Sequence, residues 1–178
     1  AAQRADGALP GIVPTSGWGF AWGNGPGWDV ILVNLPYYAW LYRGDLTIAR
    51  ENATAILRYI NYITTRVDDK GLMHIGLGDW CPTARHGYHA APLEFTDTVI
   101  CIDFCTKAAK LYEALGMKPQ QAFAEAVKND LLTAARKYLI DFGSMNALGR
   151  CQTNQAMAIF YDIFTDAEKP IAFARLVE

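Results

Sequence analysis

The feature that most restricts the fold is the alternation of two kinds of helical segment, separated by long polar loops. Residues 28–43 are apolar nearly all round and end at Gly44, a pattern typical of a helix buried on most sides. The next segment begins after a capping Asp45 and carries one apolar stripe with charged residues beside it. That stripe consists of Ala49, Ala53, Ile56, Ile60, Ile63 and Val67. This pair of patterns occurs three times and no strand alternation of any length accompanies it, so we predict an all-α chain.

The positions of the later helices suggest a ring of helical hairpins. We expect helices at residues 93–115, 119–142 and 154–164, and a capping box at residues 165–168 that opens a last helix. Long loops precede the buried helices, whereas antiparallel bundles, which share the alternation, have short ones. In an α/α toroid, inner helices form a ring, outer helices shield it and loops at one end build a cleft. About six helices make half of a six-hairpin (α/α)6 toroid, so we interpret residues 1–178 as a single incomplete fragment of a larger domain.

Composition excludes several classes of partner. The chain has 178 residues, of which 52% are hydrophobic, enough for one sizeable core. Its net charge is -2 and both signs are interspersed, which argues against nucleic acid and against a polybasic membrane patch. The longest uncharged apolar run contains Asn34 and Pro36 and is too short for a membrane span. The chain lacks an initiating Met and a signal-peptide pattern, so we expect the remainder of its own polypeptide as a partner; a periplasmic or extracellular parent protein is compatible with this.

The loop at residues 17–29 carries the strongest functional signal. It reads GWGFAWGNGPGWD, with three Trp residues among closely spaced glycines and Asp29 at the start of an apolar helix. Glycine lets the backbone approach a ligand, and indole supplies a flat face with one polar atom. A short carboxylate at a helix start caps free amides. These features predict one wall of a carbohydrate-binding site, while core packing of the Trp residues stays open as the alternative.

A second acid-indole pair, Asp79 and Trp80, lies in the loop before another inner helix. In a toroid this loop and the one ending at Trp28 and Asp29 would reach the same rim. Glycoside hydrolysis needs one carboxylic acid to protonate the leaving oxygen and a second carboxylate to activate water or attack the sugar. Helix capping is the competing interpretation, mainly for Asp29, because Asp79 is too far from the next helix to cap it.

The other polar residues fit structural roles. Glu94 and Asp97 are assigned to the first turn of the third helix, where a carboxylate suits the helix dipole. Cys101 and Cys105 lie one turn apart among apolar residues and are expected to be buried thiols. The cysteines and histidines lack metal-ligand spacing, and no P-loop, dinucleotide motif or Ser/His/Asp order occurs. We therefore expect no metal and no cofactor.

Four stretches together resemble the catalytic domain of bacterial α-L-rhamnosidases, which are inverting glycosidases with an (α/α)6 toroid. The stretches are ADGALPGIVPT, GPGWDVILVNLPYYAWLYRGD, GLGDWCP and TNQAMAIFYDIF with the final ARLVE. They agree with that family in order and spacing over nearly the whole chain. The resemblance implies a six-hairpin glycosidase fold and a terminal rhamnose as the substrate.

The resemblance also implies which residues serve the sugar. Trp28, Asp29, Asp79 and Trp80 match positions that help to bind the rhamnose ring. The family's general acid lies in a motif upstream of these residues and its general base in a later loop, so no catalytic residue is expected within this chain. Two alternatives remain open: another six-hairpin glycosidase, trehalase- or glucosidase-like, and a non-catalytic helical module that binds carbohydrate or a protein partner.

Overall fold

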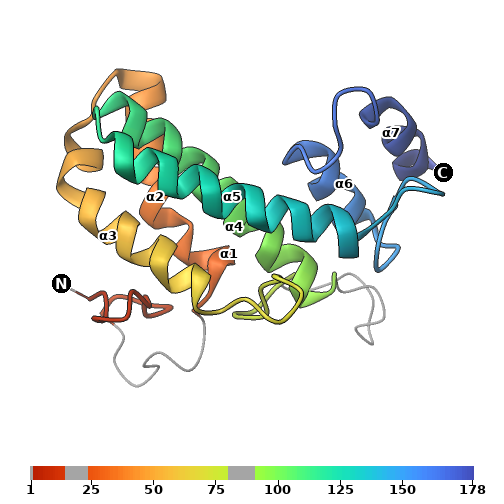
Figure 1. Cartoon of the computed structure of the whole chain (residues 1–178), viewed down its shortest axis with the longest axis horizontal. Coiled ribbons are helices and arrows are strands. Elements are labelled where there is room, and N and C mark those ends of the chain that lie inside the picture. The colour runs from red at the N-terminus through yellow and green to blue at the C-terminus, as the bar shows by residue number, and fades with distance from the viewer. Residues whose placement is uncertain (1, 15–23, 80–90) are drawn as a thin grey trace.

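The computed structural model describes residues 2–14, 24–79 and 91–178, and these form an elongated helical assembly (Figure 1). Its N-terminal and C-terminal ends lie at opposite ends of the long axis (Figure 1). A short helix comes first, six longer helices follow, and a two-stranded antiparallel hairpin separates the fifth helix from the sixth. The elements are α1 (Pro26–Asp29), α2 (Ile31–Arg43), α3 (Thr47–Thr64), α4 (Leu93–Ala114), α5 (Lys118–Tyr138), β1 (Ile140–Asp141), β2 (Asn146–Ala147), α6 (Gln152–Phe160) and α7 (Lys169–Val177).

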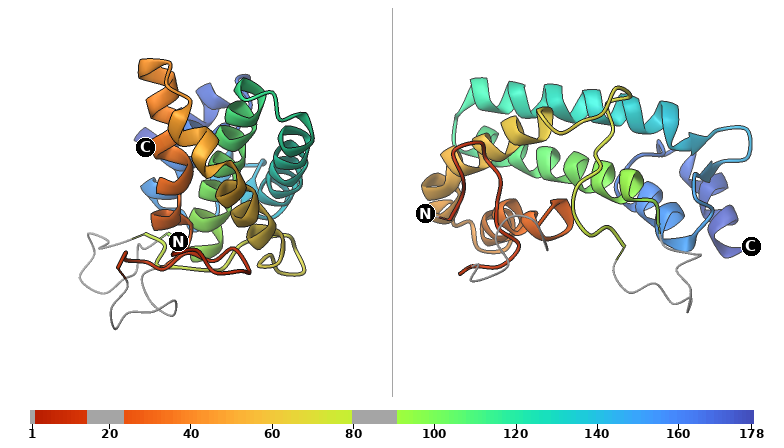
Figure 2. Two further views of the ribbon diagram at one scale, coloured as in Figure 1. Left: turned by 90° about the vertical axis from the view of Figure 1, so that its left-hand side faces the viewer. Right: turned by 90° about the horizontal axis from the view of Figure 1, so that it is seen from below.

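The six longer helices pair in chain order as α2–α3, α4–α5 and α6–α7, which confirms the predicted hairpins. Figure 2 shows α4 and α5 side by side along the length of the molecule, with the other two pairs toward its ends. Helix α4 is central because it packs against α1, α2, α3, α5 and α6. It is also buried over most of its length, as the prediction of an inner helix requires.

The core lies between α3, α4 and α5. The predicted stripe of α3 from Ala49 to Ile63 is buried, together with Tyr59, whose ring lies 4.8 Å from that of Phe104 on α4. Each large apolar side chain buried in this way stabilises the fold by about 1.5–3 kcal/mol. Cys101 and Cys105 are buried as free thiols, as expected.

Helix α2 departs from the sequence prediction. It was expected to be buried on most sides, but only Val33 and Pro36 are buried. The rest of its apolar surface is half-buried or exposed, and its main contacts among the described elements are with α3 and α4. The exposed α2 face, as we call it below, consists of Ile31, Leu35, Tyr38, Leu41 and Tyr42.

Several helix boundaries also differ from those predicted, including those of α6, which was expected at residues 154–164 and runs from Gln152 to Phe160. The helix expected at residues 28–43 is divided at Val30, which separates α1 from α2. The helix expected to reach Phe142 ends at Tyr138, because the next residues form the β1–β2 hairpin, in which Ile140 pairs with Ala147. The two-residue strands are too short to produce a recognisable sequence alternation.

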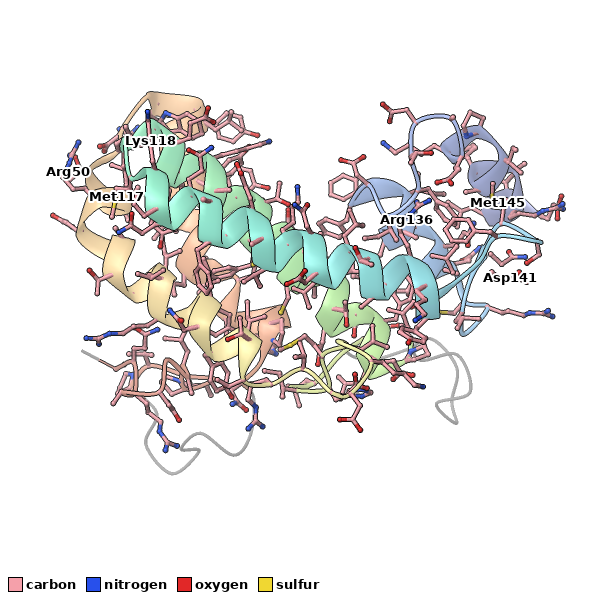
Figure 3. The ribbon with its side chains drawn as sticks, viewed as in Figure 1. Arg50, Met117, Lys118, Arg136, Asp141 and Met145 are labelled. Atoms are coloured by element: carbon pink, nitrogen blue, oxygen red, sulfur yellow. The ribbon has the colours of Figure 1, made fainter. Side chains whose placement is uncertain are left out.

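An arginine on α5 holds the third hairpin against the rest of the chain. Arg136 points from α5 toward α6 and α7 (Figure 3), where its guanidinium donates to both Glu168 carboxylate oxygens at 2.9 Å and to the Ile163 carbonyl at 2.6 Å. It also lies 4.7 Å from the centre of the Phe142 ring. The guanidinium lowers the pKa of Glu168 to about 2. Glu168 accepts the Thr165 backbone N–H, which is one half of the predicted capping box, but α7 begins only at Lys169 and has no side-chain cap hydrogen bond.

No helix within the described ranges is both long enough and apolar enough to cross a membrane.

Candidate carbohydrate site

The two acid-bearing loops meet at a pair of glycines. Gly25 and Gly76 both have positive φ values, 114° and 96°, which favour glycine. A Cβ added to Gly76 would lie 2.8 Å from the Asn24 carbonyl oxygen and 2.9 Å from the Cα of Gly25. The two loops therefore touch backbone to backbone, where no side chain fits. Figure 1 shows the loop after α3 passing along the same edge as α1.

Asp29 is held inside the protein by two hydrogen bonds to one of its oxygens. Its Oδ2 accepts the Tyr59 hydroxyl at 2.8 Å and the Gly25 backbone N–H at 3.2 Å. Asp29 is only 3% exposed. This burial raises the pKa of its carboxyl group to about 7, although both hydrogen bonds lower the pKa. Neither α1 nor α2 has a side-chain cap hydrogen bond, so the capping of the apolar helix that the sequence left open for Asp29 is not found. Asp29 can hold a proton near neutral pH.

Trp28 lies beside Asp29 but faces outward. It is 53% exposed and lines an open cavity of about 600 Å³ whose wall also includes Asp29. Most of the remaining wall is apolar and comes from the N-terminal segment and the start of α2: Leu9, Pro10, Val13, Ile31 and Leu32. A large aromatic face beside a single carboxyl group is suited to a ligand with one apolar face and several hydroxyls.

Asp79 bridges two later elements. Its Oδ2 accepts the Ala91 backbone N–H at 3.3 Å and the Thr153 hydroxyl at 3.2 Å, which links the second loop to the first turn of α6. Asp79 is thus directed toward α6 and is not part of the wall around Trp28. Trp80, predicted beside it, lies outside the described residues.

Sequence reasoning assigned Asp97 to the wrong part of its helix. Helix α4 begins at Leu93, so Asp97 falls in the second turn, where it is 1% exposed and directed inward. Its Oδ2 has no hydrogen-bond partner among the described residues, and the Ile75 backbone amide hydrogen-bonds the carboxyl. Burial, with a further contribution from Asp29, raises the pKa of Asp97 to about 8. Three consecutive polar residues inside an apolar helix, Thr96 to Thr98, were the available signal.

Tyr59 was also missed, because a tyrosine in an apolar stripe gives no sign that its hydroxyl serves a distant carboxylate. Within the described chain, no group of three or more His, Cys, Asp or Glu side chains is arranged to hold a metal ion. His74 instead pairs with Asp68 at 2.8 Å.

Residues 1–178 match the family of the bacterial alpha-L-rhamnosidase 6 hairpin glycosidase domain. The chain belongs to this family. Two alpha-L-rhamnosidases of Formosa agariphila align with this rhamnosidase-family chain, one at 30% identity over 58% of the chain and one at 24% identity over 99%. The chain spans only 10% and 19% of their lengths, respectively.

Solved structures show the same fold for this part of the rhamnosidase domain. The alpha-L-rhamnosidase of Streptomyces avermitilis, crystallised with L-rhamnose, superposes with a TM-score of 0.85 at 21% identity over 99% of the chain. The enzyme of Dictyoglumus thermophilum gives a TM-score of 0.82 at 18% identity, again over 99%. The chain covers 16% and 20% of those two proteins. The rhamnosidase-family chain is therefore mostly helical and corresponds to a small part of each larger protein.

Proposed function

We propose that this chain forms part of the catalytic domain of an α-L-rhamnosidase, which releases terminal rhamnose from glycosides with inversion at the anomeric carbon. Membership of the rhamnosidase six-hairpin family supports the reaction class. The observation that carries the proposal is the cavity lined by Trp28 and Asp29, at the edge where the two predicted loops meet.

Each of the four predicted residues has a role in this proposal. The exposed indole of Trp28 packs against the apolar face of the sugar ring. Asp29 offers its Oδ1 to a sugar hydroxyl, because Oδ2 is occupied by Tyr59 and Gly25 and no described residue hydrogen-bonds Oδ1. Asp79 and Trp80 contribute from the second loop, with Asp79 held by Thr153.

The general acid and general base are proposed to lie in the remainder of the polypeptide. In an inverting enzyme the two carboxyl groups stand about 6.5–9.5 Å apart, which leaves room for the attacking water. We assign proton transfer to neither Asp29 nor Asp97, since their hydrogen bonds go to the backbone and to Tyr59. The remainder of the polypeptide would also cover the exposed α2 face.

The test uses the full-length protein and an aryl α-L-rhamnoside. Proton NMR in the first minutes of the reaction should show β-L-rhamnose as the initial product, and α-L-rhamnose would refute inversion. A panel of aryl glycosides separates rhamnose from the sugars of trehalase- and glucosidase-like enzymes. The 178-residue chain alone should give no turnover, and clear hydrolysis by it would show that the acid and base are misplaced here.

A further inference from the structure

Three consecutive polar residues on α4 are buried: Thr96, Asp97 and Thr98. Burying polar groups is costly unless each has a partner, so such a run in a central helix needs a reason. Thr96 lies at the end of the first turn, where its hydroxyl donates to the Leu93 carbonyl at 3.2 Å, and Asp97 and Thr98 lie in the second turn, beyond the reach of N-terminal capping.

All three residues face one segment of the second loop. The Thr98 hydroxyl accepts the Met73 backbone N–H at 2.9 Å, and the Asp97 carboxyl accepts the Ile75 amide. A Cβ on Gly78 would lie 3.4 Å from the Thr96 hydroxyl oxygen, so the backbone passes close to that side chain too. The segment from Met73 to Gly78 is therefore laid along α4.

The other side of this segment carries the contact with the first loop. Gly76 touches Gly25, whose backbone N–H donates to Asp29. Asp29 and Asp97 thus hold the two backbones that meet at the glycine pair, one from each side. Helix α1, which contains Trp28 and Asp29, packs directly against α4.

We propose that Asp97 is a positioning residue that fixes the Ile75–Gly76 backbone against Gly25, and thereby sets the placement of Trp28 relative to Asp79 across the sugar site. The identity of the ligand rests on the proposed function, whereas the contact between the two backbones does not. Asp97 does not touch the cavity wall, so it acts through the loop.

The charge environment makes this role dependent on pH. The titratable groups facing the two carboxyls are Tyr59 and Tyr62 on α3 and Cys101 on α4, and no cation of the described chain shifts the pKa of either carboxyl. The pKa of Asp97, about 8, lies above its ordinary value, so the carboxyl is neutral through neutral pH and ionises as the pH rises further. An ionised Asp97 buried near Asp29 is disfavoured. The hydrogen bond from Ile75 favours the ionised carboxyl, but the cost of burying the charge is larger, so ionisation should open the junction and weaken rhamnose binding above about pH 8.

Asp97→Asn is the informative variant because asparagine keeps the shape of the neutral acid and cannot ionise. Asp97→Leu removes the acceptor, and Cys105→Ala is the control for lost packing elsewhere on α4. L-Rhamnose affinity of the full-length proteins is measured by calorimetric titration between pH 6 and pH 9. Hydrogen exchange of peptides covering residues 73–79 and 24–29 is followed in the same proteins without ligand.

The proposal makes separate predictions for the two readouts. Asp97→Asn should bind rhamnose like wild type at pH 6 but lack the weakening at alkaline pH. Asp97→Leu should weaken binding by about tenfold, the effect of one lost buried hydrogen bond, and accelerate exchange in both loops. Cys105→Ala should change neither. Unchanged exchange in Asp97→Leu, or alkaline weakening that persists in Asp97→Asn, would overturn it.

Hydrogen exchange also separates this inference from the proposed function. If wild type binds no rhamnose, the sugar assignment fails, but faster exchange in Asp97→Leu would still establish the positioning role. If wild type binds rhamnose and exchange is unaffected by Asp97→Leu, the positioning role fails alone.

Discussion

Replacing Gly76 by alanine should disrupt the junction of the two loops, whereas the same replacement at a glycine with no close neighbours should not. The new methyl group would meet the Asn24 carbonyl oxygen at 2.8 Å and the Gly25 Cα at 2.9 Å. Both atoms belong to the backbone, so no side-chain rotation relieves the contact. The φ of 96° adds a separate cost, since an L side chain rarely adopts it.

Gly116→Ala is the matched control, because Gly116 also has a positive φ, 72°, but nothing lies within 4 Å of its added Cβ. The left-handed conformation alone costs about 1–2 kcal/mol, and overpacking adds about 1–3 kcal/mol at Gly76 only. Gly76→Ala should therefore lower the free energy of unfolding by about 2–5 kcal/mol, and Gly116→Ala should lower it by about 1–2 kcal/mol.

The assay measures thermal unfolding and rhamnoside kinetics of the full-length variants together. Gly76→Ala should lower the apparent Tm more than the control and raise KM by about tenfold or more, which corresponds to about 1.4 kcal/mol of binding energy. Gly116→Ala should leave KM unchanged because it lies at the far end of α4 from the loops. Equal losses in Tm and equal KM for the two variants would refute the loop junction as a determinant of the site.

Further predictions concern the third hairpin, the buried carboxyl and the isolated chain. Arg136→Met should destabilise the protein by about 1.5–3 kcal/mol above pH 5, since it removes a partly buried bidentate ion pair with Glu168 and the donor to the Ile163 carbonyl. The Glu168 pKa is lowered to about 2 from 4.5, so the part of the stabilisation that comes from the ion pair should fade as the pH falls from 4.5 toward 2, and the difference between wild type and variant should shrink in acid melts. Tyr59→Phe should raise the pKa of Asp29 further above 7; because a carboxyl with a raised folded-state pKa loses stability as the pH rises from about 4 to that pKa, the apparent Tm of the variant should keep falling above pH 7, where that of wild type levels off. The isolated 178-residue chain should associate through the exposed α2 face, and a Tyr42→Lys variant should reduce the mass found by light scattering, whereas an unchanged monomer in both would contradict this.

The sequence was sufficient for the helical hairpins but not for the surfaces they bury. The stripe of α3 was predicted correctly from Ala49 to Ile63, because a period of 3.6 fixes which side chains share a face, whereas Val67 lies beyond the end of the helix. The same logic failed for α2, since uniform apolarity shows that a helix can be buried but not that its partners are present. The end of α5 was missed because the two-residue strands of the following hairpin have no periodicity.

The candidate site was predictable only in outline. Glycine and tryptophan in one loop pointed to Trp28 and Asp29, and the structure brings this loop against the second one. The supporting contacts were not predictable, because the hydrogen bond from Tyr59 to Asp29 joins residues 30 positions apart. Asp97 was misassigned because position relative to a helix start does not reveal which side chains turn inward. The roles of Trp28, Asp29, Asp79 and Trp80 in sugar binding stay predictions.

The position of L-rhamnose in crystals of the full-length protein tests the proposed site most directly. Electron density for the sugar should appear in the cavity beside Trp28, with a sugar hydroxyl within hydrogen-bonding distance of Asp29. Density for rhamnose at a site that neither loop contacts would contradict the assignment.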